Sequence, residues 1–397
     1  MIPEDWGVSK LKDITALMTN GFVGTVKSHY TDYDNGILYI QGYNVEENSF
    51  NFNGIKSVTK EFHKQHSKSC LVEGDLLTIQ TGDVGLTTIV PKELTGSNCH
   101  ALIITRLRKD KAYPKFFSYY LNSFQGRARL KEIETGTTMK HINVGDMIHF
   151  LVPIPSLEEQ ITISNALAEI DKLNQSLERV IIKKYSIKQG AMQNLLRPKE
   201  HWEKKTLGEI GTFSKGAGVK KDESLSGKLP CVRYGEIYTR HNDYIKKYYS
   251  FISDEVAKTS RKVKMGDILF AGSGETKEDI GKCVAIINDE EVYAGGDIVI
   301  LTPKGANSLF LGYYLNSPDI VKQKSSKGQG DAVVHIGTRS LEEIEINLPG
   351  IEEQAHIATI LSDMDSEIAA LEAKLNKYRQ IKQGMMENLL TGRIRLV

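Results

Sequence analysis

One short stretch, Phe270 to Gly274, has the residue types of a cofactor-binding loop. Its sequence, Phe-Ala-Gly-Ser-Gly, spells the Phe-x-Gly-x-Gly pattern of S-adenosylmethionine pockets. An enzyme that methylates an adenine amino group also needs a polar residue followed by Pro-Pro and an aromatic residue, which grip the flipped base. No Pro-Pro occurs in the chain, and the related stretch Thr78 to Gly82 lacks the glycine pattern. We therefore interpret Phe270 to Gly274 as a strand that turns into a glycine-bearing loop.

Other catalytic and metal-binding patterns are absent from the sequence. The residues from Gly272 on do not spell Gly-x4-Gly-Lys-Ser/Thr, the phosphate-binding loop. The acidic pair Glu342-Glu343 has no His or nucleophile near it in a recognisable arrangement. The four cysteines stand singly, which favours reduced, buried thiols over disulfides or a zinc site. We expect no catalytic residue, no cofactor and no metal in this chain.

Length and composition predict a multidomain cytoplasmic protein. The 397 residues exceed what one hydrophobic core usually serves, and 40% hydrophobic with 25% charged residues is ordinary for a globular protein. No apolar run approaches the roughly 20 residues that a membrane helix needs, and the first residues do not resemble a signal peptide. The net charge of +1 does not by itself support nucleic-acid binding, which would require cations gathered on one face.

The chain contains an internal repeat at an offset of 194 residues. The segment 187–196 returns at 381–390 with eight of ten residues identical. The same offset relates Tyr-Tyr-Leu-Asn-Ser at 119–123 to 313–317, and Glu-Glu-Gln at 158–160 to 352–354. Two units were therefore duplicated, and their loops then diverged.

Each repeat begins with a variable body, which we place at 1–155 and 199–349. Short strands separated by turn signals such as Asp34-Asn35-Gly36 predict mixed α/β (α+β) bodies with few helices. Helices are expected in the Phe/Tyr/Leu runs that follow Tyr113-Pro114 and Asn307-Ser308. The expected strands are Ile37 to Ile40, Leu76 to Ile79, Ala101 to Leu107, Cys231 to Tyr234, Ile268 to Ala271 and Ile298 to Thr302.

A helical arm follows each body, at 156–198 and 350–397. Ser156 with Glu159 is a capping-box candidate at the start of the first arm. The second arm has apolar residues at alternating spacings of three and four, interrupted only by Lys382, while the first arm has Asn174 and Lys184 at seam positions. We expect the arms, each roughly 60 Å long, to pair as an antiparallel coiled coil with the two bodies in a pseudo-twofold repeat. The seam residues of the second arm are Leu361, Met364, Ile368, Leu371, Leu375, Tyr378, Met385 and Leu389.

Taken in order, these motifs resemble the DNA-specificity (S) subunit of Type I restriction-modification enzymes over the whole chain. The two helix starts, at 156–160 and 350–354, lack a second proline that is more usual in that family, which affects only the local strand-to-helix geometry. The motifs that carry the resemblance are Trp6-x4-Leu11-x2-Ile14, Trp202-x4-Leu207-Gly208-Glu209-Ile210, the Gly-Asp-Leu/Ile-Leu strands at 74–77 and 266–269, the Glu-Glu-Gln helix starts and Leu-Leu-Thr-Gly-Arg at 389–393.

The resemblance implies a non-catalytic protein with two target recognition domains, each reading one half of a split double-stranded DNA target. It implies that the arms fix the gap and dock two modification subunits, which methylate adenine with S-adenosylmethionine. Restriction subunits would add ATP- and Mg-dependent translocation and cleavage. Two alternatives stay open. A stand-alone methyltransferase or nuclease would bind S-adenosylmethionine by itself, whereas a purely structural coiled-coil adaptor would lack sequence-specific DNA affinity even with its partners.

Three pairs of loops at equivalent places in the two repeats form the candidate DNA-reading face, at 24–29 and 216–221, 80–83 and 272–277, and 136–141 and 327–335. Specific readout uses Arg on guanine and Asn or Gln on adenine, while Lys, Ser and Thr contact phosphates. In the first repeat the candidates are Lys27, His29, Gln41, Gln80, Thr81, Thr137, Thr138, Lys140 and His141. In the second repeat they are Lys220, Lys221, Arg233, Ser273, Lys277, Lys327, Gln329 and His335.

Two pairs among these candidates lead to opposite expectations. Gln41 and Arg233 occupy matching strand ends but differ, as expected for two bodies with different target sequences. His141 and His335 are identical, so we expect them to support the shared fold or touch phosphate rather than discriminate bases. For any single candidate, a solvated loop or a local hydrogen bond is an equal alternative.

Overall fold

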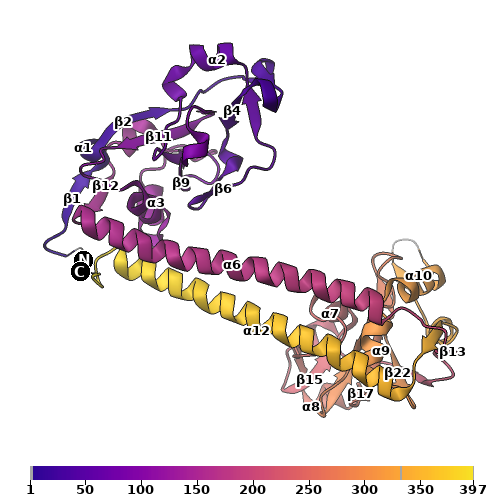
Figure 1. Cartoon of the computed structure of the whole chain (residues 1–397). Helices are drawn as coiled ribbons and strands as arrows, with labels where there is room; N and C mark the ends of the chain where they lie inside the picture. The colour runs from indigo at the N-terminus through magenta and orange to yellow at the C-terminus, as the bar shows by residue number, and fades with distance from the viewer. Residues whose placement is uncertain (1–2, 331–332, 397) are drawn as a thin grey trace. The chain divides into compact units, whose positions relative to one another are not determined.

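The structure is a computed structural model that describes residues 3–330 and 333–396, and the chain divides into two compact units (Figure 1). The first unit holds the residues up to Glu178 and those from Ala373 on, and the second holds Arg179–Glu372. The long helices α6 (Leu157–Leu195) and α12 (Ile351–Leu389) each contribute one half to each unit. Each unit is therefore one body with its own stretch of paired helix.

The first unit contains two four-stranded sheets. Strands β1 (Gly7–Lys10) and β12 (Leu151–Ile154) pair antiparallel where the body meets α6. Helices α3 (Pro114–Asn122) and α4 (Phe124–Glu132) bury Phe116, Phe117 and Leu130 in one core with the sheet. One sheet has the order β2 (Thr15–Asn20), β11 (Leu102–Leu107), β8 (Leu76–Ile79), β9 (Thr87–Ile89), and the other β10 (Asn98–Cys99), β4 (Ile37–Ile40), β7 (Lys56–Val58), β3 (Tyr30–Thr31).

The second unit repeats this plan. One of its sheets has the order β14 (Gly211–Lys215), β22 (Ile298–Pro303), β18 (Ile268–Ala271), β20 (Cys283–Ala285), and the other β16 (Ser250–Ile252), β15 (Leu229–Val232), β21 (Val292–Ala294), β17 (Arg261–Val263). The first of these has the same antiparallel order as β2-β11-β8-β9, and the parallel pair β15-β21 of the other matches β4-β10. Strand β13 (Glu203–Thr206) pairs with β24 (Glu345–Leu348) as β1 pairs with β12.

Five of the six expected strands lie where the sequence predicts them, to within one residue at either end. The prediction for Cys231 to Tyr234 is wrong, because β15 ends at Val232 and helix α7 (Tyr234–Thr239) begins at Tyr234. The cause is a cap: the Glu236 carboxylate accepts a hydrogen bond from the backbone N–H of Arg233 at 3.0 Å.

The bodies also hold more helices than the few that the sequence predicts. Both expected ones are present, as α3 and α9 (Ser308–Tyr314). Further helices are α2 (Lys60–Gln65), α4, α8 (Asp254–Ala257) and α10 (Pro318–Lys327). Most of these are short and polar, so they show no clear apolar period of 3.6 residues.

One asparagine that is identical in the two repeats, Asn122 in the first and Asn316 in the second, binds the backbone of an edge strand. Asn122 accepts a hydrogen bond from the N–H of Thr87 (2.9 Å) and donates to the carbonyl of the same residue (2.7 Å). Asn316 does the same to Cys283, at 3.1 and 2.9 Å. These asparagines therefore bind the edge strands β9 and β20 to the ends of α3 and α9.

The Gly-Asp turns before β8 and β18 need both of their residues. Gly74 and Gly266 have φ of +89° and +99°, which disfavours a side chain. The carboxylate of Asp75 accepts from the N–H of Val72, and Asp267 accepts in the same way from Lys264. This motif of the sequence thus forms a turn in each unit.

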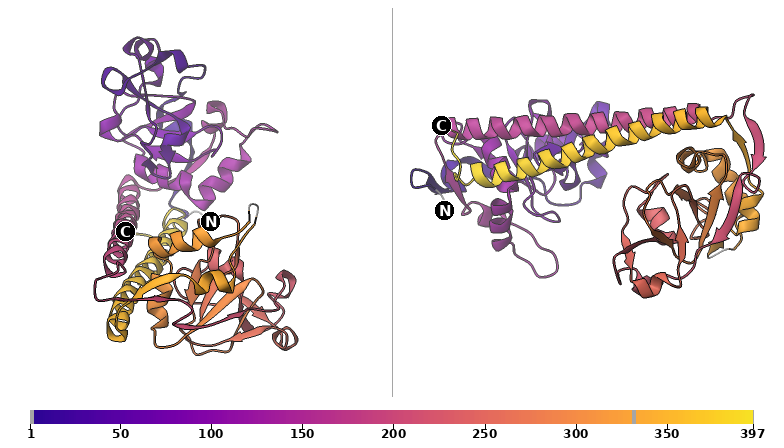
Figure 2. Two further views of the ribbon diagram at one scale, coloured as in Figure 1. Left: turned by 90° about the vertical axis from the view of Figure 1, so that its right-hand side faces the viewer. Right: turned by 90° about the horizontal axis from the view of Figure 1, so that it is seen from below.

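Helices α6 and α12 lie side by side and antiparallel within each unit (Figure 2). In the first unit Glu178 pairs with Arg379, and in the second Lys184 pairs with Glu367. The predicted seam is confirmed, since its residues from Leu361 to Leu389 are buried or half-buried, as are Leu167, Leu177 and Ile181 of α6. In the part of the chain that the structure describes, no helix is long and apolar enough to cross a membrane.

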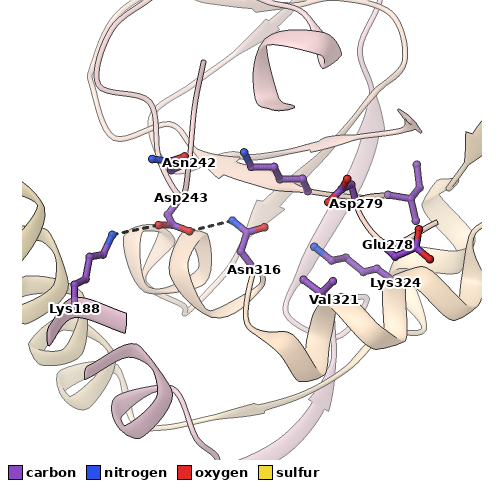
Figure 3. A pocket seen from close by; sticks show the side chains of 10 residues that line it. Lys188, Asn242, Asp243, Glu278, Asp279, Asn316, Val321 and Lys324 are labelled. Atoms are coloured by element: carbon purple, nitrogen blue, oxygen red, sulfur yellow. Dashed lines mark hydrogen bonds and ion pairs between the residues drawn. The ribbon is translucent and has the colours of Figure 1, made fainter. Parts of the chain in front are cut away.

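A half-buried lysine links the two helices to the body in each unit. In the second unit, Lys188 of α6 donates to Asp365 of α12 (Nζ–Oδ1 2.7 Å) and lies 3.7 Å from the carboxylate of Asp243 in the body (Figure 3). Tyr313 donates to the other oxygen of Asp365 at 2.5 Å, and Asn316 donates to Asp243 at 3.3 Å. Burial raises the pKa of the Asp243 carboxyl, and the Lys188 ammonium opposes this shift. The cluster borders a cavity of about 320 Å³.

The first unit contains the same cluster with the roles of the helices exchanged. Lys382 of α12 pairs with Asp171 of α6 at 2.8 Å and with Glu47 of the body at 3.2 Å, and Tyr119 donates to Asp171 at 2.7 Å. Lys382 is the residue that interrupts the predicted apolar seam. Its place is explained by this junction, in which one lysine joins three elements.

Candidate nucleic-acid interface

Gln41 and Arg233 lie at equivalent points of the two bodies. Gln41 follows β4 and precedes the short 3-10 helix η3 (Gly42–Asn44), while Arg233 follows β15 and precedes α7. Their backbone N–H groups donate to the side chains of Asn44 and Glu236, both at 3.0 Å. The same capped turn therefore holds two different side chains.

The two side chains have different surroundings. The Gln41 amide donates to the hydroxyls of Tyr43 (3.2 Å) and Tyr30 (3.4 Å). The Nε of Arg233 is buried and, among the residues that the structure describes, has no hydrogen-bond partner. A buried donor without a partner costs about 1 to 3 kcal/mol, so a rotamer that brings the guanidinium out to an acceptor on a ligand would be favoured.

The second and third candidate loops are joined in both units. In the second unit β19 (Ser273–Gly274) pairs with β23 (Val334–His335), and the Ser273 hydroxyl is 2.9 Å from Nδ1 of His335. In the first unit Thr81 forms the equivalent bridge to His141. These contacts join the second loop to the third through a histidine in each unit.

The third loop is closed by a pair of backbone hydrogen bonds in each unit. His141 and Thr135 exchange backbone hydrogen bonds at 2.9 and 3.0 Å, as His335 and Gln329 do at 2.7 and 2.9 Å. Gly136 and Gly330 have φ of +93° and +110°, and a Cβ on either would lie within 2.3 Å of a carbonyl oxygen. Exposed at or beside the turns are Thr137, Thr138, Lys140, Gln329 and Val333, while Asp331 and Ala332 lie outside the described residues.

The first loop is placed differently in the two units. In the second unit Gly218 accepts from Gly296, and Asp297 accepts from Gly272, so residues 296–297 connect the first loop to the second. Lys220 and Lys221 of this loop are exposed. In the first unit Lys27 is exposed, but the His29 ring packs 4.9 Å from the ring of Phe62 in α2.

Several candidate side chains are buried or already paired within the second unit or the first. Ser273 is only 4% exposed and its hydroxyl faces the His335 ring, whereas Gln80 is half-buried. The Lys327 ammonium pairs with Glu343 at 2.7 Å. Lys277 and Thr81, in contrast, are exposed on the second loop.

A cavity of about 470 Å³ lies where α7 meets the second and third loops of the second unit. Burial raises the pKa of Tyr238, one of its lining residues, to about 12. The hydroxyl is therefore neutral and can donate or accept a hydrogen bond at neutral pH. The cavity is lined by Tyr234, Gly235, Tyr238, Thr239, Ser273, Gly274, Glu275, Thr276, Asp279 and Val333.

The Phe-x-Gly-x-Gly stretch has a structural explanation. Phe270 and Ala271 are buried in β18, and Gly272 bonds to Asp297 and Ile336 at the joined loops. A Cβ on Gly274 would lie 2.8 Å from the Tyr238 hydroxyl. Within the described residues, no group of three or more His, Cys, Asp or Glu could hold a metal ion.

Comparisons with known proteins agree on one family. The family described as the Type I restriction modification DNA specificity domain matches twice, at residues 3–184 and 199–382. The Type I restriction enzyme MjaVIII specificity subunit of Methanocaldococcus jannaschii is 24% identical over 427 residues, covering 100% of this chain and 94% of that protein. The proposed MjaX specificity subunit of the same organism is 27% identical over 430 residues, with 100% and 95% covered.

Solved structures share the fold at lower identity. The S subunit of a Type I restriction-modification system from M. genitalium superposes with a TM-score of 0.60 at 18% identity, covering 98% of this chain and 96% of that one. The HsdS subunit of Thermoanaerobacter tengcongensis gives a TM-score of 0.51 at 18% identity, with 99% and 98% covered.

Proposed function

The chain belongs to the Type I restriction-modification DNA specificity family, and on that premise we propose that its two units read the two halves of a split DNA target. The chain is thus the DNA specificity subunit of a Type I system, in a family that is non-catalytic within its complex. Its fold, two mixed α/β recognition domains joined by two long packed helices, is that of the family.

One observation supports the proposal that each recognition domain reads its own half of the DNA target. The same capped turn in both domains presents Gln41 in the first and Arg233 in the second. Gln suits the N6 and N7 edge of adenine, and Arg suits the O6 and N7 edge of guanine. A duplicated fold with divergent side chains at one matched position is what two different half-sites require.

The remaining parts of the proposal follow from the helices. We propose that α6 and α12 fix the gap between the half-sites and dock two modification subunits, which use S-adenosylmethionine to methylate adenine. Restriction subunits with ATP and Mg would complete the system. Continuous 39-residue helices that enter both units support this role, since a helix has a fixed rise per residue.

Exchange of one domain tests the proposal. Residues 199–349 are replaced by the matching body of a relative that keeps an acid at the place of Asp243 and a tyrosine at the place of Tyr313, so that Lys188 and Asp365 retain their partners. Sequencing of methylated genomic DNA should show one half of the motif changed and the other half, with its adenine, intact. The reciprocal exchange of 1–155, with Glu47 and Tyr119 retained, should change the other half. If either exchange alters both halves, independent reading is wrong.

A further inference from the structure

A group of cations at the end of α7 lies outside all three candidate loops. Arg240 caps the C-terminus of α7, and Lys246 and Lys247 follow in the segment that leads to β16. All three side chains are exposed. We call these three residues the basic patch.

Aromatic rings hold the basic patch together. Arg240 and Lys247 both lie over the ring of Tyr249, at 5.2 and 5.6 Å from its centroid, and Lys246 lies 5.0 Å from the ring of Tyr244. Two cations on one ring repel each other, while cation–π attraction holds each in place. An anion bound between them would relieve that repulsion.

No carboxylate forms an ion pair with the basic patch. Over residues 3–330 and 333–396, none of its three cations has an ion pair or a side-chain hydrogen bond, whereas Lys188, Lys204 and Lys262 of the same unit are paired. Asp243 and Asp365 line a cavity of about 130 Å³ together with the three cations, but both carboxylates are paired with Lys188. The cations of the basic patch therefore keep their charge unpaired at the surface.

The shared fold does not require these cations. Glu47 contacts Lys382 in the first unit as Asp243 contacts Lys188 in the second, so the two segments correspond. The first-unit segment, 44–53, contains Glu46 and Glu47 and no Lys or Arg. The basic patch is thus a property of one recognition domain only.

We propose that the basic patch binds the phosphodiester backbone of the DNA beside the half-site that the second domain reads. This inference rests on the proposed function and adds a sequence-independent contact to it. Arg233 and Arg240 cap opposite ends of α7, whose six residues span roughly 9 Å, or two to three base-pair steps. A base-reading side chain and phosphate contacts at that separation fit one half-site, in which phosphate contacts set position and base contacts set sequence.

Salt dependence distinguishes a phosphate contact from a structural role. Each phosphate neutralised changes the slope of log K against log salt by about 0.9. The triple variant R240Q/K246Q/K247Q, assembled with its modification subunit, should therefore lose roughly 2 to 3 from that slope on duplexes with and without the target. Its preference for target over random DNA should change less than about threefold.

A matched control removes three cations that already have partners. Lys204, Lys205 and Lys262 pair with Glu345, Glu203 and Glu291, so K204Q/K205Q/K262Q changes net charge equally and should leave the slope unchanged. The charge-conserving K246R/K247R variant should also keep the native slope. Fluorescence anisotropy between 50 and 200 mM salt measures all four proteins.

Two results would overturn the inference. One is a triple variant with the same slope as its matched control. The other is a triple variant that no longer assembles with the modification subunit while its own DNA affinity stays native, which would assign the patch to that protein. Failure of the proposed function would look different, because the native complex itself would not prefer target to random DNA.

Discussion

Replacement of Lys188 by methionine should destabilise the second unit strongly. The substitution removes the cation between Asp365 and Asp243 and leaves two carboxylates, whose side chains are 13% and 12% exposed, without their ion-pair partner. Removal of one partner from a buried ion pair costs about 3 to 5 kcal/mol, because the remaining charge stays desolvated. With a urea m-value of about 2 kcal/mol/M, the unfolding midpoint should fall by about 1.5 to 2.5 M.

Two further variants serve as controls for the expected loss of stability in Lys188→Met. Lys204 pairs with Glu345 at 2.8 Å, but both side chains are more than half exposed, so Lys204→Met should cost less than about 1 kcal/mol. Adding Asp365→Asn to Lys188→Met should recover part of the loss. The asparagine removes one buried charge and keeps an acceptor for the Tyr313 hydroxyl.

The chain provides a separate reporter for each unit. It has two tryptophans, Trp6 in the first unit and Trp202 in the second, where Trp202 packs on Phe310 and Tyr314. In a Trp6→Phe background, fluorescence of Trp202 follows urea unfolding of the second unit alone. If Lys188→Met lowers the midpoint no more than Lys204→Met, the account of a buried charge cluster is refuted.

The effect of Lys188→Met should also depend on pH. Burial raises the pKa of Asp243 above its ordinary 3.8, so the folded state binds this proton more readily than the unfolded state. Such a group favours folding most below 3.8, and this contribution is lost as the pH rises through the folded pKa. Loss of the Lys188 ammonium raises that pKa further. The difference between native protein and variant should therefore be largest at pH 7 and shrink as the pH falls toward the ordinary 3.8.

Three further expectations concern the DNA contact of Arg233, the role of helices α6 and α12 in fixing the gap between the half-sites, and the repeated asparagine. Arg233→Ala should weaken binding to the target by about 1 to 3 kcal/mol and leave random DNA nearly unaffected in a binding titration, whereas equal loss on both would reassign it to phosphate. Seven residues inserted after both Glu178 and Glu372 lengthen each helix by about 10.5 Å and nearly preserve the seam. The methylated motif should then gain about three base pairs of gap, and an unchanged gap would exclude the helices as the ruler. Asn316→Ala should destabilise the second unit by about 2 to 4 kcal/mol, as read by Trp202, because the N–H and carbonyl of Cys283 in β20 lose their partner. The exposed Asn242→Ala should change stability by less than about 0.5 kcal/mol.

The fold was predictable where local pattern and tertiary packing agree. The apolar strands at 76–79 and 268–271 have the predicted bounds, and the paired helices begin at Leu157 and Ile351, one residue after the predicted starts of the arms. The capping box at Ser156 is half present. Its hydroxyl accepts from Glu159, but the Glu159 carboxylate binds Trp6 and Arg395 instead of its own helix start. Partners 153 and 236 residues away are not visible in a local pattern.

The sequence predicted which loops of the candidate interface correspond in the two repeats, but not which of their side chains are exposed. The order of the repeats places the second and third loops together, as the Ser273 and His335 pairing shows. Burial of Ser273 and capture of Lys327 by Glu343 depend on tertiary contacts that loop sequence does not encode. The basic patch was missed because an acid, Asp243, lies among its cations in sequence. In the structure Asp243 pairs with Lys188, so it does not form an ion pair with the cations of the basic patch.

If this chain selects the DNA sequence that its complex modifies, the methylated motif of a cell must depend on it. Methylome sequencing of cells with and without the chain measures this dependence. We expect a split motif, two specific halves around a fixed gap with a methylated adenine in each, that is present with the chain and absent without it. Methylation that persists without the chain, or a motif with no gap, would show that the chain does not select the sequence.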